Sequence, residues 1–512
     1  MKPRHFLTIA LVFTLVGGSL QAGAGEKEKP VFYALKKSNP GRAFAEAGIV
    51  LGVISAYYWI KYANYREDWR YELNWRDQRL RFFTLKAHSF DSNNFKINWG
   101  HVYQGTAFYN FFRSNNQSTF AAAANNVLSS LVWEYVSEWR EVISINDNIC
   151  TAIGGLPSGE AVFRLGRHLS LQPGRAARLL GWIVNPIQAL NLAFDRRAWE
   201  GVTPQIDHPL NRLEFYLGMK YGRPRFDRET APQFSIGFDT RLMTVPGHGR
   251  PGSGQSWEGD TLKSTYAMRF NFHDYAVNEY TILTRVLWCG WVWQRVDAGG
   301  GGRHLILGLT SAFELLKNRP FWPYDYQLNV ITAERRQTPR PTQFADKFCL
   351  VNLLGPAVDL GLQRSKWTLN AEAGATIDFG LVNALALGRY SVDHDLAGAK
   401  TTVLGFGYYY AFGATLYGEV GLKTPTLQLA LGTRWSSFAS INGRDQFQAM
   451  VTDNFALADR RLLLHASLRA NLPDSPLGLK AGWEYQQRDG RIEAIRARQA
   501  EHRFYTGLSW VF

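Results

Sequence analysis

Two different hydrophobic periods divide the chain near residue 205. Before this point apolar residues recur at the spacing of an α-helix, and after it they alternate with polar residues. The alternation is clear in Leu213, Leu217 and Tyr221, where every second side chain belongs to one face of a strand. The pattern predicts helices in the N-terminal part and an antiparallel sheet in the C-terminal part.

The last eleven residues form the most regular alternating segment. Counting back by twos from Phe512 gives Trp510, Leu508, Thr506 and Phe504, so one face is almost entirely apolar. A strand that ends on Phe resembles the closing strand of a bacterial outer-membrane β-barrel, with Phe504, Leu508, Trp510 and Phe512 as its barrel-closing residues. The resemblance implies an exported protein of the outer membrane of a Gram-negative bacterium.

Thirteen segments after residue 205 are candidate strands, and the links between the later ones alternate between long and tight. Barrels of this class have short periplasmic turns and long outer loops, and single-chain bacterial barrels have an even number of strands. We therefore predict twelve strands, with fourteen as the alternative; 211–221 and 322–334 are the weakest candidates. The candidates are 211–221, 234–242, 266–272, 279–295, 303–316, 322–334, 346–362, 366–380, 402–422, 426–438, 459–472, 477–487 and 502–512. The long links are 381–401, 439–458 and 488–501, and the tight ones are 363–365, 423–425 and 473–476.

The N-terminal part contains several candidate helices. They lie at 43–65, 98–113, 119–142, 158–169 and 177–199, the last broken at Pro186. The uninterrupted apolar run of the first, Ala47 to Ile60, is shorter than the ~20 residues that a spanning helix needs. We therefore expect these helices to form a domain and not a membrane anchor.

The first residues have the features of a secretory signal. Lys2 and Arg4 precede an apolar run from Phe6 to Val16, and Ala22-Gly23-Ala24 is a small-residue cleavage site. We expect removal of a signal peptide at 1–24, a helical domain at 25–205 and an outer-membrane barrel at 206–512. The fold class is thus an α+β membrane protein, an antiparallel transmembrane β-barrel preceded by a helical domain that plugs the barrel or caps its periplasmic mouth.

Charge and composition agree with this setting. The chain has a net charge of +14, 14% aromatic residues and 46% hydrophobic residues. A basic exported protein suits outer-membrane lipid and lipopolysaccharide as partners, beside the barrel-assembly machinery, and does not suit nucleic acid. The three cysteines, Cys150, Cys289 and Cys349, match no zinc or redox spacing and are interpreted as buried small hydrophobic residues. No signature of a bound cofactor is present.

Candidate chemistry is concentrated in the helical domain. His101 could act as a general base with Glu134 or Asp147 orienting it, because imidazole titrates near neutral pH. Alternatively, His101, Glu138 and Asp147 could bind a metal, or the polar residues could form a buried network that fixes the helices to each other or to the barrel wall. The network residues are Asn98, Arg113, Glu138, Ser144, Asn146, Glu160 and Arg164.

These residues carry a family resemblance. An Asn-x-x-His helix at Asn98, a Trp-Glu helix at Glu134, a Ser-x-Asn-Asp turn at Ser144 and a Gly-Gly…Gly-Glu segment ending at Glu160 resemble the bacterial domain of unknown function 3943. The resemblance covers about residues 90–200. It implies an outer-membrane or periplasmic setting and no established reaction.

Standard catalytic motifs are missing elsewhere. The chain has no His-Glu-x-x-His zinc motif and no Gly-x-Ser-x-Gly elbow. Residues 299–302 are predicted to be a hairpin turn and 247–252 a flexible outer loop.

Three functions agree with this organisation. The first is a transport or structural barrel that its own helices plug or gate, with Glu134, Glu138 and Arg113 meeting lumen-facing charges. The second is an outer-membrane lipid-modifying enzyme that uses His101 with Glu134 or Asp147. The third is an adhesion or assembly factor acting through the long loops. For the first, the expected lumen-facing partners are Arg241, Arg269, Glu372 and Arg434.

Overall fold

The computed structural model describes residues 38–62, 69–170, 172, 174–195, 211–222, 232–245, 248–249, 251–273, 276–318, 346–364, 366–473 and 475–511. The expected signal peptide, the domain boundary at 205, the candidate strand 322–334 and Phe512 lie outside these residues.

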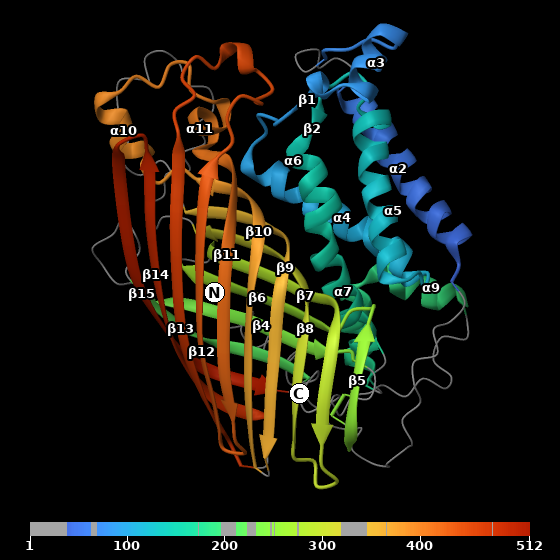
Figure 1. The fold of residues 1–512 in the computed structure, drawn as a ribbon, viewed down its shortest axis with the longest axis vertical. Helices are drawn as coiled ribbons and strands as arrows, with labels where there is room; N and C mark the ends of the chain where they lie inside the picture. Colours follow the sequence, from blue (N-terminus) through green and yellow to red (C-terminus); the bar gives the residue numbers. More distant parts are fainter. Residues whose placement is uncertain are drawn as a thin grey trace.

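Twelve antiparallel strands close into a barrel, as predicted from the alternation (Figure 1). Neighbouring strands pair in sequence order around the ring, and the pairings β7–β8 and β15–β3 close it; Leu508 of β15 lies opposite Leu217 of β3. The strands are β3 (Arg212–Gly222), β4 (Gln233–Met243), β6 (Lys263–His273), β7 (Ala276–Val296), β8 (Gly302–Asn318), β9 (Lys347–Arg364), β10 (Trp367–Asn383), β11 (Tyr408–Lys423), β12 (Leu427–Ser440), β13 (Leu457–Asn471), β14 (Leu477–Ile492) and β15 (Ile495–Val511). A further strand, β5 (Gly252–Glu258), pairs with the end of β7 outside the ring.

Three sequence predictions about the links need correction. The expected long loop 488–501 is a tight turn, because β14 and β15 extend as a paired polar ladder to Ile492 and Ile495. The start of the expected strand 402–422 is helix α11 (Thr401–Phe406), which ends at Gly407 with a φ of +66°. The expected outer loop 247–252 overlaps the start of β5, where Gly252 pairs with Val296 beside the tight turn between β7 and β8. The weak candidate 211–221 is a true strand, and 299–302 is the predicted hairpin turn.

The lumen of the barrel is filled by its own charged side chains. Ion pairs cross it between strands on opposite sides, as from Arg241 of β4 to Glu419 of β11 at 2.6 Å and from Arg269 of β6 to Glu484 of β14 at 2.8 Å. Lys263 of β6 pairs with both Asp359 and Glu372 across the lumen. A cavity of about 330 Å³ remains among these charges.

An apolar cluster closes the barrel at the end that carries the long loops. The link between β10 and β11 folds into α10 (Leu387–Asp393) and α11, and places Leu387 and Val403 over the lumen. These side chains pack against Leu350, Tyr409 and Phe438, which face inward from the strands. The barrel therefore has a lid built from its own loop.

The outer face of the wall is apolar. Strand positions that alternate with the lumen-facing charges carry exposed hydrophobic side chains, the pattern of a barrel surrounded by lipid. Examples are Leu307, Leu360, Ile377, Leu416, Leu431, Leu468, Leu479, Phe504 and Leu508. Trp510 shares this strand face with Phe504 and Leu508, so these three predicted residues belong to the outer surface of the closing strand.

The N-terminal helices form a layer beside the barrel (Figure 1). Their order includes two short π-helical segments, η3 and η4, and a two-stranded pairing of β1 with β2. The elements are α2 (Pro40–Tyr62), α3 (Trp75–Phe83), η2 (Leu85–Ala87), β1 (His88–Ser89), α4 (Phe95–Ser114), α5 (Thr119–Val132), η3 (Trp133–Ser137), β2 (Ile143–Ser144), α6 (Ile145–Asn148), η4 (Ile149–Gly154), α7 (Gly155–Ser170), α8 (Arg175–Val184) and α9 (Pro186–Asp195). The helix predicted at 119–142 thus ends at Val132, since the chain widens into a π turn.

The helical layer contacts the outside of the wall. Ser158 of α7 lies 3.0 Å from the hydroxyl of Thr284, and Leu165 of α7 packs on Leu242, both on outward positions of their strands. Val102 of α4 shares an apolar cluster with Phe379, which lies on the same face of β10 as exposed Ile377.

This arrangement corrects the predicted position of the helices inside the barrel or across its mouth. The lumen-facing residues expected to receive Glu134, Glu138 and Arg113 are already neutralised by other strands. Arg241 and Arg269 pair as described above, Glu372 binds Lys263 and Arg434 binds Glu314. The outward apolar positions, in contrast, are complementary to the helices.

Candidate active site on the outer wall

The site begins at the start of α4. Asn94 caps this helix through its side chain, which accepts hydrogen bonds from the backbone N–H groups of Lys96 and Ile97. One turn later, Asn98 is fully buried and its amide donates to the hydroxyl of Tyr408 at 2.6 Å. This bond ties α4 to the barrel wall and sets the position of His101, which follows three residues further along the helix.

A close approach of two backbones brings the next partner to His101. A Cβ atom on Gly105 would lie 1.9 Å from the carbonyl oxygen of Thr151, and one on Gly155 would lie 2.6 Å from the Cα of Gly105. Only glycine permits this contact between α4 and the η4–α7 segment. The Gly-Gly pair noted in the sequence therefore positions Thr151 beside the helix that carries His101.

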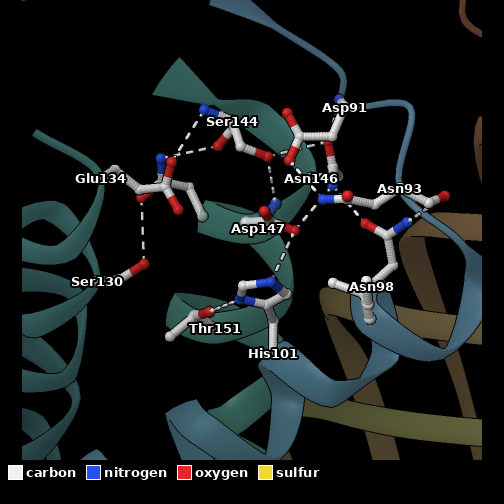
Figure 2. A network of polar contacts seen from close by, with 12 residues as sticks. Asp91, Asn93, Asn98, His101, Ser130, Glu134, Ser144, Asn146, Asp147 and Thr151 are labelled. Carbon is white, nitrogen blue, oxygen red and sulfur yellow. Dashed lines mark hydrogen bonds and ion pairs between the residues drawn. The ribbon is translucent and has the colours of Figure 1, made fainter. Parts of the chain in front are cut away.

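His101 lies between a carboxylate and a hydroxyl (Figure 2). Its Nε2 is 3.4 Å from Oδ1 of Asp147, and its Nδ1 is 3.4 Å from Oγ1 of Thr151. Asp147 and Thr151 are buried, whereas 14% of the His101 side chain is exposed. The three residues form a row of hydroxyl, imidazole and carboxylate.

A second carboxyl group extends this row. Burial, with the neighbouring Asp147, raises the pKa of Asp91 well above its usual range, so Asp91 is the protonated partner of the pair. Burial also raises the pKa of Asp147, to about 6, although its hydrogen bonds with Asp91 and Ser144 oppose the shift. Asp91 therefore holds the proton that the two carboxyl groups share and donates it to Asp147, which faces the imidazole.

The loop that carries Asp147 is fixed by local hydrogen bonds. The hydroxyl of Ser144 accepts from the N–H of Asp147 at 3.2 Å, and the amide of Asn146 donates to the Asp147 carboxylate at 2.9 Å. Tyr410 of the barrel wall donates to the amide oxygen of Asn98 at 3.1 Å. The predicted network residues Asn98, Ser144 and Asn146 thus converge on one site.

Glu134 belongs to the shell around the site and not to the row itself. Its carboxylate accepts from the backbone N–H of Ser144 at 2.9 Å, which holds the loop before Asp147. Burial, with the nearby charge of Glu141, raises the pKa of Glu138 well above its usual range. Glu134 lies in the π-helical segment η3 and Glu138 follows it, because the regular helix α5 ends at Val132.

A buried arginine that the sequence did not single out fixes this turn. Arg81 of α3 is completely buried and donates only to backbone carbonyl groups and one amide. It compensates the loss of regular helical bonds beyond Val132. Its backbone acceptors are Glu134, Tyr135, Glu138 and Glu141, at 2.7 to 3.0 Å.

The other predicted network residues form a separate cluster at the opposite end of α4. Glu160 accepts from Arg113 at 2.9 Å and from Arg164 at 2.7 Å, and also from the hydroxyl of Tyr109 at 2.7 Å. All of its acceptor capacity goes to these neighbours. Arg113, Glu160 and Arg164 therefore stabilise the helix packing and do not contact His101.

The geometry favours acid–base chemistry over metal binding. Within the ranges that the structure describes, no three His, Cys, Asp or Glu side chains converge in a way that suits a metal ion, so the set His101, Glu138 and Asp147 gains no support. Burial lowers the pKa of His101 to about 4, below the near-neutral value expected from the sequence, so the imidazole is neutral at physiological pH and can accept a proton from the neighbouring hydroxyl. Thr151 lies in one π-helical segment, η4, and a second, η3, precedes the loop that carries Asp147; such segments are frequent at functional sites.

Several site residues could not be assigned from the sequence. Asp91 precedes Asn98, the first residue of the motifs named above. Tyr408 and Tyr410 lie in the barrel, more than 300 residues after Asn98. Thr151 lies between the Ser-x-Asn-Asp turn and the glycine pair, but nothing in the sequence indicates that it contacts His101. The signal that was present is the glycine pair at Gly154 and Gly155, which marks a close approach of the backbone.

The helical domain matches a known protein family. A family model described as a domain of unknown function (DUF3943) matches residues 87–187, which confirms the resemblance predicted over 90–200. No curated protein matches the chain. The match contains the whole row from His101 to Thr151 and leaves the barrel outside.

Solved structures similar to the chain are bacterial barrels. They include the outer membrane protein OmpT of Vibrio cholerae (8% identity, TM-score 0.22, covering 59% of this chain and 96% of that one). The translocator domain of the autotransporter NalP of Neisseria meningitidis has 10% identity and a TM-score of 0.19, covering 64% and 95%. The channel DcaP of Acinetobacter baumannii has 8% identity and a TM-score of 0.20, covering 59% and 97%.

Proposed function

We propose that the protein is an outer-membrane lipid-modifying enzyme whose catalytic centre is Thr151, His101 and Asp147. The observation that carries this proposal is the position of His101, between a carboxylate and a hydroxyl, on the lipid-facing side of the barrel wall. A transport plug would instead place these groups in the lumen. The barrel then serves as a scaffold that holds the helical domain at the membrane.

The chemistry that fits this row is transfer or hydrolysis of an acyl ester. His101 removes the proton from a hydroxyl group, either that of Thr151 or that of a water molecule. The oxygen attacks the ester carbonyl carbon, and the protonated imidazole then gives its proton to the departing alkoxide. Asp147 orients the ring and stabilises its positive charge, and Asp91 holds Asp147 in place.

The expected partners follow from this role. The substrate class is an acylated lipid of the outer membrane, including lipopolysaccharide, and the net charge of +14 favours such anionic surfaces. Delivery to the outer membrane requires export with cleavage of the signal peptide and then the barrel-assembly machinery.

Lipid analysis of cells tests the proposal. Outer membranes from a strain lacking the protein are compared with membranes from strains that produce the wild type, His101→Ala or the control His394→Ala. His394 is an exposed histidine of the lid region, away from the row. The proposal expects a change in acylated lipids with the wild type and the control but not with His101→Ala. Identical lipids in all strains, with equal amounts of folded protein, would refute it.

A second candidate is a gated transport barrel, which one observation favours. The cavity of about 330 Å³ lies beneath the lid of α10 and α11. If this lid is the gate, the full-length chain is closed in a planar bilayer, and replacement of residues 386–405 by a short Gly-Ser link opens it. A variant without the lid that stays closed would remove this candidate, because the ion pairs in the lumen would then be the barrier.

A further inference from the structure

Three long helices of the N-terminal domain have no charged side chain in their middle. The charge-free stretches are Ala47–Ile60 in α2, Ile97–Phe112 in α4 and Thr119–Val132 in α5. Soluble helical domains place charged residues along their exposed faces. The charge-free stretches lie side by side in three neighbouring helices. Their exposed faces therefore suit a hydrocarbon environment better than water.

Charged residues gather at the two ends of this layer instead. At one end, Arg42 of α2 pairs with Asp195 at 2.6 Å, near the cluster of Arg113 and Glu160. At the other end, Tyr58 of α2 donates to Glu141, and Arg140 pairs with Glu72 at 2.6 Å. The domain thus has two polar ends and an apolar middle.

The second end also carries an aromatic belt. Trp59 stacks on Trp139 with ring centres 5.6 Å apart, and the guanidinium of Arg140 lies 4.2 Å above Trp69. Lys61 lies over the ring of Tyr62. Tryptophan, tyrosine and basic side chains of this kind concentrate where the hydrocarbon of a bilayer meets water.

The face of α2 that points away from the other helices is exposed and apolar. Val53 is 63% exposed and Ile60 82%, and Ile49 lies on the same outer side. Among the described residues, α2 is the one helix whose length and composition suit a membrane span. Its charge-free stretch from Ala47 to Ile60 extends about 21 Å, most of the ~25 Å apolar band of an outer-membrane barrel.

Close backbone contacts inside the layer are of the kind found between membrane helices. Gly105 and Gly155 allow α4 and α7 to touch, and Gly159 lies against Tyr109, where a Cβ would come within 2.6 Å of the ring. Small residues at helix interfaces allow tight packing where no hydrophobic effect drives association.

We infer that the helical domain lies inside the outer-membrane bilayer beside the barrel, with lipid acyl chains against the exposed faces of α2 and α5. The same apolar belt continues around the barrel on Leu307, Leu416 and Leu431, so the two surfaces form one lipid-facing perimeter. The apolar run of α2 is too short for a helix that crosses a bilayer alone. In this domain, however, α2 packs beside other charge-free helices and the barrel, which cross the same hydrocarbon layer.

The orientation places the His101 row at the outer leaflet. The N–H of Phe90, just before Asp91, donates to the carbonyl of Arg444 at 2.6 Å, in the long loop between β12 and β13. Long loops of outer-membrane barrels face the outside. The position in the bilayer rests on charge and exposure and the orientation rests on this contact, so neither depends on the catalytic role.

Accessibility of spin labels tests the inference on the full-length protein in vesicles of outer-membrane lipid. Labels are attached to Val53→Cys, to Leu431→Cys as a barrel reference and to Glu72→Cys as a water reference, all in a Cys289→Ser background. The two other cysteines are completely buried. Collisions with oxygen report lipid, and collisions with a water-soluble nickel chelate report water.

The inference expects the Val53→Cys label to behave like the Leu431→Cys label, with high access to oxygen and low access to nickel. Nickel access equal to that of the Glu72→Cys label would place the domain in water and overturn the inference. Low access to both reagents would also overturn it, because a second copy or another protein would then cover α2. The Leu431→Cys and Glu72→Cys labels verify that the barrel has inserted.

Discussion

The Nε2 atom of His101 lies 3.4 Å from Oδ1 of Asp147, on the outer side of a barrel wall whose lumen is filled by its own ion pairs. The contact joins α4 to α6 at the end of the domain where the long loops lie. It sets this chain apart from a plugged pore, in which the polar groups of the helices would face the lumen.

Replacement of Asp147 by Asn should remove most of the lipid-modifying activity that we propose, without unfolding the protein. Asparagine keeps the size of the side chain but loses the charge that orients and stabilises the imidazolium, and general-base catalysis is worth about 10²- to 10⁴-fold. The rate of product formation by purified Asp147→Asn is compared with that of Glu134→Gln, whose carboxylate holds the Ser144 N–H instead. Equal losses in both variants would contradict the assignment of roles.

The stability of the site should decrease as the pH rises from about 4 to about 6. Burial raises the pKa of Asp147 from 3.8 to about 6, so the folded state binds a proton that the unfolded state releases. That stabilisation is complete below pH 3.8 and is lost as the pH passes through the folded value. Hydrogen exchange of the amides in α6, corrected for the intrinsic pH dependence, measures it. Asp147→Asn should flatten the profile, and a flat profile in the wild type would be inconsistent with the shift.

Substitution of Gly105 by Ala should disrupt the contact that brings Thr151 to His101. The added methyl group would lie 1.9 Å from a backbone carbonyl oxygen, whereas one on Gly100, on the same helix, meets nothing within 4 Å. We expect Gly105→Ala to cost about 1–3 kcal/mol or more in the free energy of unfolding. Gly100→Ala should be neutral or stabilising, because Ala favours a helix over Gly by about 1 kcal/mol. Similar unfolding curves for both variants in urea would show that the close approach is absent.

Substitution of Glu160 by Gln should destabilise the helical domain strongly. It would leave Arg113 and Arg164 without their buried counter-charge, and breaking a buried pair from one side costs about 3–5 kcal/mol. The matched control is Asp195→Asn, which breaks the more exposed pair with Arg42 and should cost about 0–1 kcal/mol. Denaturant unfolding followed by tryptophan fluorescence distinguishes them, and equal costs would argue against a structural role for the Glu160 cluster.

The barrel could be predicted because alternation is a local property of the sequence. Every second residue from Leu213 to Tyr221 belongs to one face of a strand, and thirteen such segments, with the even strand number of bacterial barrels, predict twelve strands. The pairing at 488–501 could not be predicted, because this segment carries polar residues on both faces, such as Arg488 and Arg498, and shows no alternation. Polar strands nevertheless pair where they extend beyond the bilayer. Helix periodicity likewise located α4 and α5 but could not show where α5 becomes a π turn.

The position of the helices could not be predicted from their periodicity. Apolar and polar faces show that a helix has a partner, but they do not show which side of a barrel wall provides it. Asp147 and His101 could be grouped from the sequence because both lie in one short region, and the structure places them 3.4 Å apart. Asp91, Tyr408 and Tyr410 were missed because only the tertiary structure joins the start of α4 to a strand three hundred residues away.

Reconstitution gives the most direct test of the central claim that His101 acts on lipid from the outer side of the wall. Purified wild type, His101→Ala and His394→Ala are inserted into vesicles of extracted outer-membrane lipid, and acylated species are followed by mass spectrometry. The account predicts that the wild type and His394→Ala change the acyl pattern with time and that His101→Ala does not. An unchanged pattern with folded, inserted wild-type protein, or equal conversion by His101→Ala, would contradict it.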